Sequence, residues 1–159
     1  MKSKKVLFIS STGGHLSEMM QLADMFSKYD YHIITEKTPS NVGLLAKHPN
    51  RVSYLVYGSK THLLTYPFKL FFNTIKSIYY YFKIRPKAII TTGAHTAGPM
   101  CLIGKLFGSK IIYIETLANM NSKTITGRII YWFADLFIVQ WESMLKLYPK
   151  AVYGGWIYK

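Results

Sequence analysis

Short, largely apolar runs alternate with segments of helical periodicity along the whole chain. The runs are typical of strands that are buried on both faces of a sheet, and they span 6–10, 31–35, 52–56, 88–91, 110–114 and 136–139. Helical patterns separate them over 16–26, 67–83, 97–107, 125–134 and 142–147. This alternation predicts an α/β fold, a Rossmann-like doubly wound parallel sheet with helices on both faces.

The length of the chain limits this fold to one unit. A chain of 159 residues can bury one sizeable core and is too short for two. No repeat, low-complexity segment or linker interrupts it. We therefore predict a single domain over 1–159.

Charge points to an anionic partner. Lys and Arg total 20 and Asp and Glu total 7, so the net charge is +13. Nucleic acid, an anionic membrane surface and phosphorylated substrates all fit this imbalance, as does a merely basic protein. Basic charge combined with 13 tyrosines and 9 phenylalanines favours a membrane surface. We find no helix-turn-helix, RNP or zinc-finger pattern, so no nucleic acid is predicted.

The compartment follows from the cysteine count and the amino terminus. Cys101 is the single cysteine, which is typical of a reducing compartment. The first apolar run is too short for a signal peptide, and no uncharged apolar stretch reaches the ~18 residues of a spanning helix. We expect a peripheral protein on the cytoplasmic face of the cell membrane.

Glycine-rich loops follow two of the predicted strands. The first contains Ser11, Thr12, Gly13, Gly14 and His15, and it opens a helix. Paired glycines allow a ligand to approach the backbone, although a tight capped turn explains the same pattern. The loop is neither G-x-G-x-x-G nor a P-loop, so the sequence supports neither a dinucleotide enzyme nor an NTPase. An imidazole at its end is a candidate general base, or a structural hydrogen-bonding group.

The second glycine loop and a carboxylate complete the predicted cleft. Thr92, Gly93 and His95 follow the run 88–91, and Glu115 follows 110–114. Because the carboxyl ends of parallel strands meet at one edge, these loops should share a ligand cleft with the first. Glu115 is suited to bind hydroxyls or to orient a histidine, or else to cap the next turn.

The segment 67–83 is both basic and aromatic. Lys69, Lys76 and Lys83 recur at intervals of seven residues and share one helical face, while Phe72 and Tyr79 belong to an apolar face. Such a helix is typical of a membrane interface. An ordinary sheet-covering helix with a solvated lysine edge is the alternative.

Metal and cofactor motifs are missing from the sequence. It contains no Asp-x-Asp, no Cys/His cluster with zinc spacing and no Gly-x-Ser-x-Gly elbow. We therefore predict no metal and no cofactor.

Several motifs together resemble one known family. They are Ser11-Thr12-Gly13-Gly14-His15-Leu16-x-Glu18-Met19, Thr92-Gly93-Ala94, Ile114-Glu115, Ala134-Asp135-x-Phe137-x-Val139-Gln140-Trp141, Tyr148-Pro149-Lys150-Ala151 and Tyr153-Gly154-Gly155. The set resembles the Alg14-like polysaccharide biosynthesis proteins, especially the bacterial capsular and exopolysaccharide members described as β-1,4-galactosyltransferase enhancers. It covers nearly the whole chain.

The resemblance implies half of an enzyme. Alg14-like proteins are similar to the amino-terminal, acceptor-binding half of a GT-B glycosyltransferase such as MurG. An Alg13-like partner would hold the UDP-sugar. In the bacterial members, galactose would be transferred to a lipid-diphosphate-linked sugar. Transfer would invert the anomeric centre without a metal, and the chain alone would be inactive.

The resemblance also gives the candidate residues their roles. His15 and Glu115 would be catalytic, and the two glycine loops would bind the acceptor. The aromatic tail 141–159 would dock the partner subunit through Trp141, Tyr148, Pro149, Tyr153 and Trp156, or else pack on its own sheet. A non-catalytic membrane adaptor that recruits and activates the partner would share every one of these features except the role of His15.

Overall fold

A seven-stranded sheet, parallel throughout, forms the centre of the protein. The computed structural model describes residues 4–58 and 66–158. In chain order the strands are β1 (Lys5–Ile9), β2 (Asp30–Glu36), β3 (Val52–Leu55), β4 (Ala88–Thr91), β5 (Lys110–Ile114), β6 (Leu136–Val139) and β7 (Val152–Tyr153). Their spatial order, β3-β2-β1-β4-β5-β6-β7, reverses direction between β1 and β4. The predicted Rossmann-like fold is confirmed.

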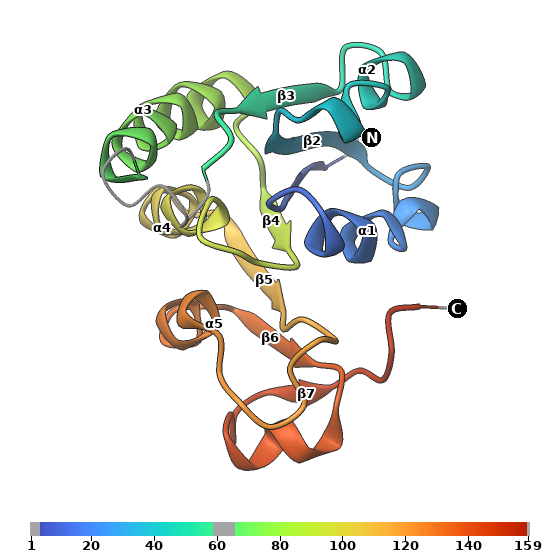
Figure 1. Cartoon of the computed structure of the whole chain (residues 1–159), viewed down its shortest axis with the longest axis vertical. Helices are drawn as coiled ribbons and strands as arrows, with labels where there is room; N and C mark the ends of the chain where they lie inside the picture. The colour runs from blue at the N-terminus through green and yellow to red at the C-terminus, as the bar shows by residue number, and fades with distance from the viewer. Residues whose placement is uncertain (1–3, 59–65, 159) are drawn as a thin grey trace.

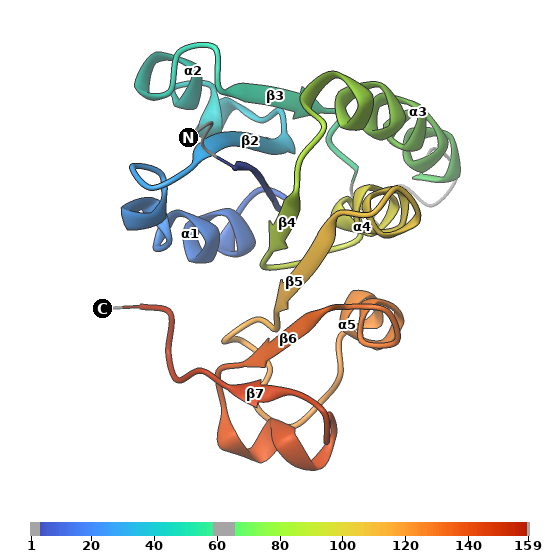
Figure 2. The same cartoon turned by 180° about the vertical axis from the view of Figure 1, so that it is seen from behind.

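Helices cover both faces of this sheet. They are α1 (Gly14–Met20), α2 (Leu44–Lys47), α3 (Tyr66–Ile84), α4 (Ala97–Leu106) and α5 (Ile125–Ile130), with short 3-10 turns at Ala23–Met25, Pro39–Asn41 and Glu142–Lys146. Figures 1 and 2 show α3, α4 and α5 as one layer, while α1 and the carboxyl-terminal tail lie on the opposite face. We call these the α3–α5 face and the α1 face.

Each face has its own core because side chains alternate along every strand. In β1, Leu7 and Ile9 pack beneath the α3–α5 layer with Met100 of α4. Val6 and Phe8 of the same strand pack beneath α1 with Met19. The site described below lies where the loops leave these two cores.

Several element boundaries differ from the sequence prediction, and three of the differences are substantial. The predicted helix 16–26 is interrupted after Met20, where the chain continues into the 3-10 turn Ala23–Met25. The predicted helix 125–134 ends at Ile130. The two-residue strand β7 was not predicted, because two residues are too few to show an alternating pattern.

Helix α3 presents its polar stripe inward and its aromatic face outward. Asn73 and Ser77 are buried against the sheet, and the Asn73 amide bonds both the N–H and the carbonyl of Val56 at 2.8 Å. The Lys76 ammonium also turns inward, donating to the Tyr54 carbonyl at 2.7 Å. The same stripe buries Tyr81 and Ile84, so α3 covers the sheet while most of its large apolar side chains stay exposed.

The α3–α5 face exposes large apolar side chains from all three helices. On α3 they are Phe68, Phe71, Phe72, Ile75, Ile78, Tyr79 and Phe82; beyond it they are Leu102, Leu106, Phe107, Ile125, Ile129 and Trp132. Trp132 is the most exposed of them, at 86%. Nowhere in 4–58 or 66–158 is a helix both long and apolar enough to cross a membrane. The exposed surface is therefore wider than the single helix predicted from the sequence.

Candidate functional site

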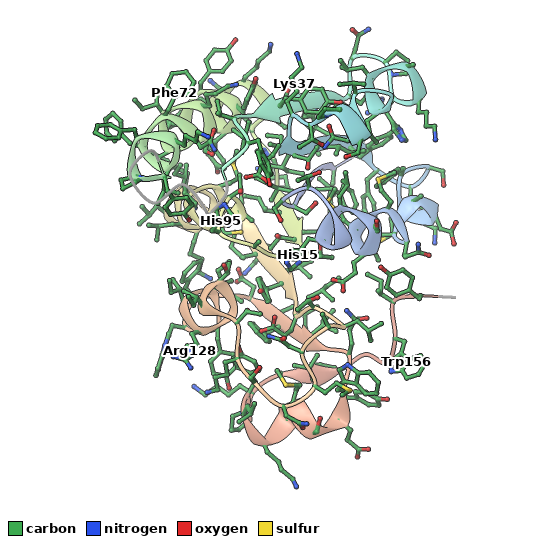
Figure 3. The ribbon with its side chains drawn as sticks, in the orientation of Figure 1. His15, Lys37, Phe72, His95, Arg128 and Trp156 are labelled. Carbon is green, nitrogen blue, oxygen red and sulfur yellow. The ribbon has the colours of Figure 1, made fainter. Side chains whose placement is uncertain are left out.

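The candidate site lies at the point where the strand order reverses. Loops that leave the carboxyl ends of β1 and β4 meet there, as they do in ligand-binding crevices of open α/β sheets. The two loops are joined by a hydrogen bond from the Ser11 N–H to the Gly93 carbonyl, 3.3 Å long. In Figure 3, His15 and His95 lie near the middle of the molecule, whereas Phe72 lies on the outer side of α3.

His15 is held in one orientation by Thr92. Its Nδ1 lies 2.8 Å from the Thr92 carbonyl oxygen, and the Thr92 hydroxyl donates in return to the His15 carbonyl at 2.7 Å. Because a carbonyl only accepts, the neutral ring must carry its proton on Nδ1. This tautomer leaves a lone pair on Nε2, which is the arrangement that a general base requires.

Gly93 allows the two loops to come this close. Its φ of +97° lies in the left-handed region that favours glycine. An added Cβ would lie 3.0 Å from the Tyr113 hydroxyl and 3.5 Å from Cε1 of His15. The close neighbours of Gly93 are therefore side chains of the protein, and approach of a ligand to its backbone stays a prediction.

Glu36 is a buried carboxylate that the sequence analysis did not single out. It ends β2, and its oxygens accept hydrogen bonds from the Thr96 hydroxyl at 2.7 Å and from the N–H groups of Gly58 and Thr12 at 3.3 and 3.4 Å. Nε2 of His95 lies 3.6 Å from Oε1. Burial alone would raise the pKa of Glu36, but the nearby His95 ring and the hydrogen bonds from Thr96 and Gly58 outweigh burial and lower it. Glu36 therefore ties the loops after β1, β3 and β4 together as an ionised group.

Glu115 is also buried, and its oxygens are occupied within the domain. They accept from the Tyr148 hydroxyl at 2.9 Å, the Thr124 hydroxyl at 3.0 Å and the Thr116 N–H at 3.1 Å. Burial raises the pKa of Glu115, and these hydrogen bonds offset that rise only in part. Glu115 is 1% exposed, and these bonds support the start of α5. A structural role therefore fits its surroundings, and its catalytic role stays a prediction.

A cavity of about 420 Å³ opens beside these groups. His15 and His95 line it on one side, and Tyr113 and Thr124 line another part of its wall. Its volume falls within the roughly 300–1,000 Å³ of small-molecule sites. The structure thus brings His15 and His95 together in one cavity, with Thr92 and Gly93 directly behind them.

The rest of the first glycine loop lies outside that cavity. Ser11 is buried, and the Thr12 hydroxyl is 3.1 Å from that of Thr38. Gly13 and Gly14 are exposed, and a Cβ at either would meet open space. Their backbone borders the approach to His15, so any contact with an acceptor remains a proposal.

The aromatic residues of the tail are divided between core and surface. Tyr148 is fully buried beside Glu115, so the prediction that it docks a partner is wrong. Trp141 is half-buried, donates to the Leu117 carbonyl at 2.7 Å and packs on Trp156 with ring centroids 5.1 Å apart. Pro149, Tyr153 and Trp156 are exposed and remain candidates for an interface.

The sequence match to a family model decides the family. The model described as "Oligosaccharide biosynthesis protein Alg14 like" matches residues 59–157, more than half of the chain. The chain belongs to the Alg14-like family. This agrees with the resemblance drawn from the two glycine loops and the carboxyl-terminal motifs.

Curated relatives of this Alg14-like chain are named as transferase subunits. "UDP-N-acetylglucosamine transferase subunit ALG14" of Mus musculus is 25% identical over 184 residues, covering 97% of this chain and 83% of the relative. The Schizosaccharomyces pombe protein of the same name is 29% identical over 178 residues, covering 96% and 82%. Both are eukaryotic, and the expected bacterial capsular subtype stays a prediction.

The Alg14-like domain superposes on part of several larger solved structures. MurG of Acinetobacter baumannii superposes with a TM-score of 0.69 at 19% identity, over 88% of this chain and 42% of MurG. UDP-N-acetylglucosamine 2-epimerase of Rickettsia bellii gives 0.70 at 12%, over 92% and 41%. The chain spans less than half of the length of either. At these identities the likeness is one of fold.

Proposed function

We propose that this Alg14-like chain is the acceptor-binding, membrane-associating subunit of a two-component glycosyltransferase. An Alg13-like partner would hold the UDP-sugar, and this chain would present a lipid-diphosphate-linked sugar to it. Two findings support this division of the enzyme between two chains. The relatives are named as subunits, and the domain superposes on less than half of MurG. The geometry of His15 carries the catalytic part of the proposal.

His15 would act as the general base for the acceptor. As the acceptor hydroxyl oxygen attacks the anomeric carbon, its proton passes to Nε2, the nitrogen left unprotonated by the Nδ1 contact with Thr92. The bond from the anomeric carbon to the UDP oxygen breaks, and UDP leaves with the electron pair. Attack from the opposite side inverts the anomeric centre. The partner would stabilise the departing diphosphate, and no metal ligand is needed from this chain.

His95 and the glycine loops would position the acceptor. His95 lines the cavity with its Nε2 3.6 Å from Oε1 of Glu36, where its ring could hydrogen-bond a phosphorylated ligand. Backbone N–H groups after Gly13 add donors at the entrance, because the first turn of a helix leaves such groups without partners in the helix. Together they would bind the sugar and its diphosphate.

The α3–α5 face would lie on the cytoplasmic surface of the membrane. Phe72 and Tyr79 are exposed at 52% and 59%, and Lys83 lies at the end of the same helix with its ammonium 5.7 Å from the Tyr79 ring centroid. Large exposed apolar patches mark interaction surfaces, and a basic edge attracts anionic lipids. Lys69 would add to this charge, whereas Lys76 is turned toward β3.

Partner docking would use the surface around β7. This strand is the last in the sheet, so one edge of it has no neighbouring strand within the described residues. Tyr153 and Trp156 are exposed there at 49% and 61%, and Pro149 lies nearby in the chain. Exposed aromatic side chains of this kind are enriched at interfaces.

The test is a reconstituted transfer assay with variants of His15. The Alg13-like partner is assayed alone, with the wild-type chain and with His15→Ala, on vesicles that contain a lipid-linked acceptor. A general base predicts that His15→Ala lowers kcat by about 10²–10⁴-fold. His48→Ala, at a histidine bonded to Tyr31 on another part of the surface, is the matched control and should retain activity.

The same assay tests the alternative function. If the chain is a non-catalytic adaptor that recruits and activates its partner, His15→Ala will stimulate the partner as well as the wild type does. UDP-galactose and UDP-N-acetylglucosamine are supplied in parallel. Resemblance to the capsular enhancers predicts galactose, whereas the named relatives point to N-acetylglucosamine.

A further inference from the structure

A second cavity adjoins the one that contains His15. Its volume is about 470 Å³, and its walls come from α3, α4 and α5. Tyr66, His95, Ile125 and Thr126 line both cavities. The two therefore share a wall of four residues, and we call the second one the α3–α5 groove.

The lining of the α3–α5 groove is apolar. Leu102 and Ile103 come from α4, and Ile129 and Phe133 face them from α5 and the residues after it. Thr74 also lines it, but its hydroxyl donates to the Leu70 carbonyl at 2.8 Å within α3. Apart from the His95 end shared with the candidate site, the groove thus offers a ligand little besides hydrocarbon.

The groove also reaches the exposed apolar surface. Leu102 and Ile129 line it away from the shared wall and are at the same time among the exposed large hydrophobic residues of the α3–α5 face. One end is therefore next to the histidines, and the other opens where the protein would meet lipid. A ligand that fills both cavities must have a polar head and an apolar chain.

We propose that the α3–α5 groove binds the apolar chain of the acceptor lipid, a polyisoprenoid chain, while its phosphorylated sugar head occupies the cavity at His15 and His95. The proposal rests on the proposed function, because it assumes a lipid-linked acceptor. The new element is a binding site on the protein for the part of the lipid chain nearest the head. The acceptor would then be held by both its sugar head and its lipid chain. The length of the lipid chain would therefore affect the affinity of the acceptor.

Gly98 allows the groove to be filled without disturbing the fold. It lies in α4, lines the groove, and an added Cβ would meet no atom within 4 Å. The leucine side chain of Gly98→Leu should therefore occupy the space of the lipid chain. Gly43→Leu is the matched control, because Gly43 is exposed, also has open space around its Cβ position and does not line the groove.

The first measurement is direct binding, which needs neither partner nor catalysis. Geranylgeranyl phosphate, below its micellar concentration, is titrated against wild type, Gly98→Leu and Gly43→Leu. We expect Gly98→Leu to weaken binding about tenfold or more and Gly43→Leu to leave it unchanged. Dihexanoyl phosphatidylglycerol and inorganic phosphate are titrated in parallel. Equal affinity for the phospholipid, or equal binding by Gly98→Leu, overturns the proposal.

The second measurement is transfer in detergent micelles to two acceptors with the same head, one with a long polyisoprenoid chain and one with a short alkyl chain. Gly98→Leu should raise KM for the long-chain acceptor about tenfold and leave the short-chain KM unchanged. An equal change for both acceptors overturns the proposal.

If Gly98→Leu does not fold, Ile129→Gln at the exposed rim of the groove takes its place. It too should raise KM for the long-chain acceptor and leave the short-chain KM unchanged. If the wild-type chain and its Alg13-like partner together glycosylate neither acceptor, the result counts against the proposed function. The binding measurement still tests whether the groove binds the lipid chain.

Discussion

The two faces of the sheet are covered by helices of opposite character. On the α1 face, Leu16 and Met19 of α1 are buried and Ser17 is exposed, as in most helices of water-soluble proteins. On the α3–α5 face, α3 buries Asn73 and Ser77 together with Tyr81 and Ile84, and it exposes most of its other aromatic residues. An amphipathic pattern therefore identifies a helix but not which side of it faces the core. Here the outward aromatic side indicates a partner other than water.

The largest expected effect comes from truncating equivalent large side chains on the two faces. Met19→Ala should lower the free energy of unfolding by about 2–5 kcal/mol, because the Met19 side chain is completely buried. Phe71→Ala should change it by less than about 0.5 kcal/mol, because Phe71 is 68% exposed. Urea denaturation measures both. Equal losses would mean that Phe71 is packed in solution, and the contrast between the faces would be lost.

The polar underside of α3 gives the next largest effect. Asn73→Ala removes two hydrogen bonds to Val56 and should cost about 1–3 kcal/mol. Ser77→Ala is the control on the same stripe. Its buried hydroxyl has no hydrogen-bond partner within the described part of the chain, so its loss should be neutral or slightly stabilising. The same denaturation assay compares them, and similar costs would argue against the inward polar stripe.

Membrane binding provides a comparison of smaller effects. Phe71→Ser should weaken partition onto phosphatidylglycerol-containing vesicles about tenfold. Leu45→Ser, at an exposed apolar residue of α2, should leave it unchanged. In the variant that retains only Trp132 (Trp141→Phe, Trp156→Phe), brominated lipids should quench the indole fluorescence. Vesicle binding that Leu45→Ser reduces as strongly as Phe71→Ser would show that the α3–α5 face is not the lipid-binding surface.

The smallest expected effect is a change in how stability depends on pH, and it compares two of the buried carboxylates, Glu36 and Glu115. The pKa of Glu36 is lowered on folding, so its contribution is present above the unfolded pKa of about 4.3 and is lost as pH falls through the folded pKa. The pKa of Glu115 is raised, so its contribution is fully present below about 4.3 and is lost as pH rises through the folded pKa.

Glutamine variants separate these opposite dependences. The free energy of unfolding is measured between about pH 3 and pH 7 for wild type, Glu36→Gln and Glu115→Gln. Glu36→Gln should reduce the loss of stability in acid, and Glu115→Gln should reduce the loss toward neutral pH. If both variants changed the pH dependence of the free energy of unfolding in the same direction, the result would contradict the opposite pKa changes.

Sequence periodicity predicted most of the sheet because the central strands are continuously apolar. The bounds of β4, β5 and β6 agree with the predicted runs. The carboxyl-end rule also identified the loops that contain His15 and His95, since that rule depends only on strand order. Periodicity could not predict the orientation of α3, because that depends on the bonds of Asn73 to a backbone distant in sequence.

The candidate site was predicted less completely than the fold. Glu36 is the last residue of β2, and no local pattern shows that it joins Thr96 to Thr12. Glu115 and Tyr148 received functional roles from their places in the sequence and from the family resemblance, whereas the structure places them together in the core. Gly127 makes this contact possible, since a Cβ there would clash with both. Such contacts are long-range and leave no local signal in the sequence.

The central claim is that this chain supplies the acceptor side of a two-chain transferase. Its most direct test is sugar transfer from UDP-galactose and from UDP-N-acetylglucosamine to a lipid-linked acceptor on vesicles, with the Alg13-like partner alone, this chain alone and the two together. The account predicts that product forms only when both chains are present. Transfer by the partner alone at the rate of the pair, or no transfer by the pair with either donor, would contradict it.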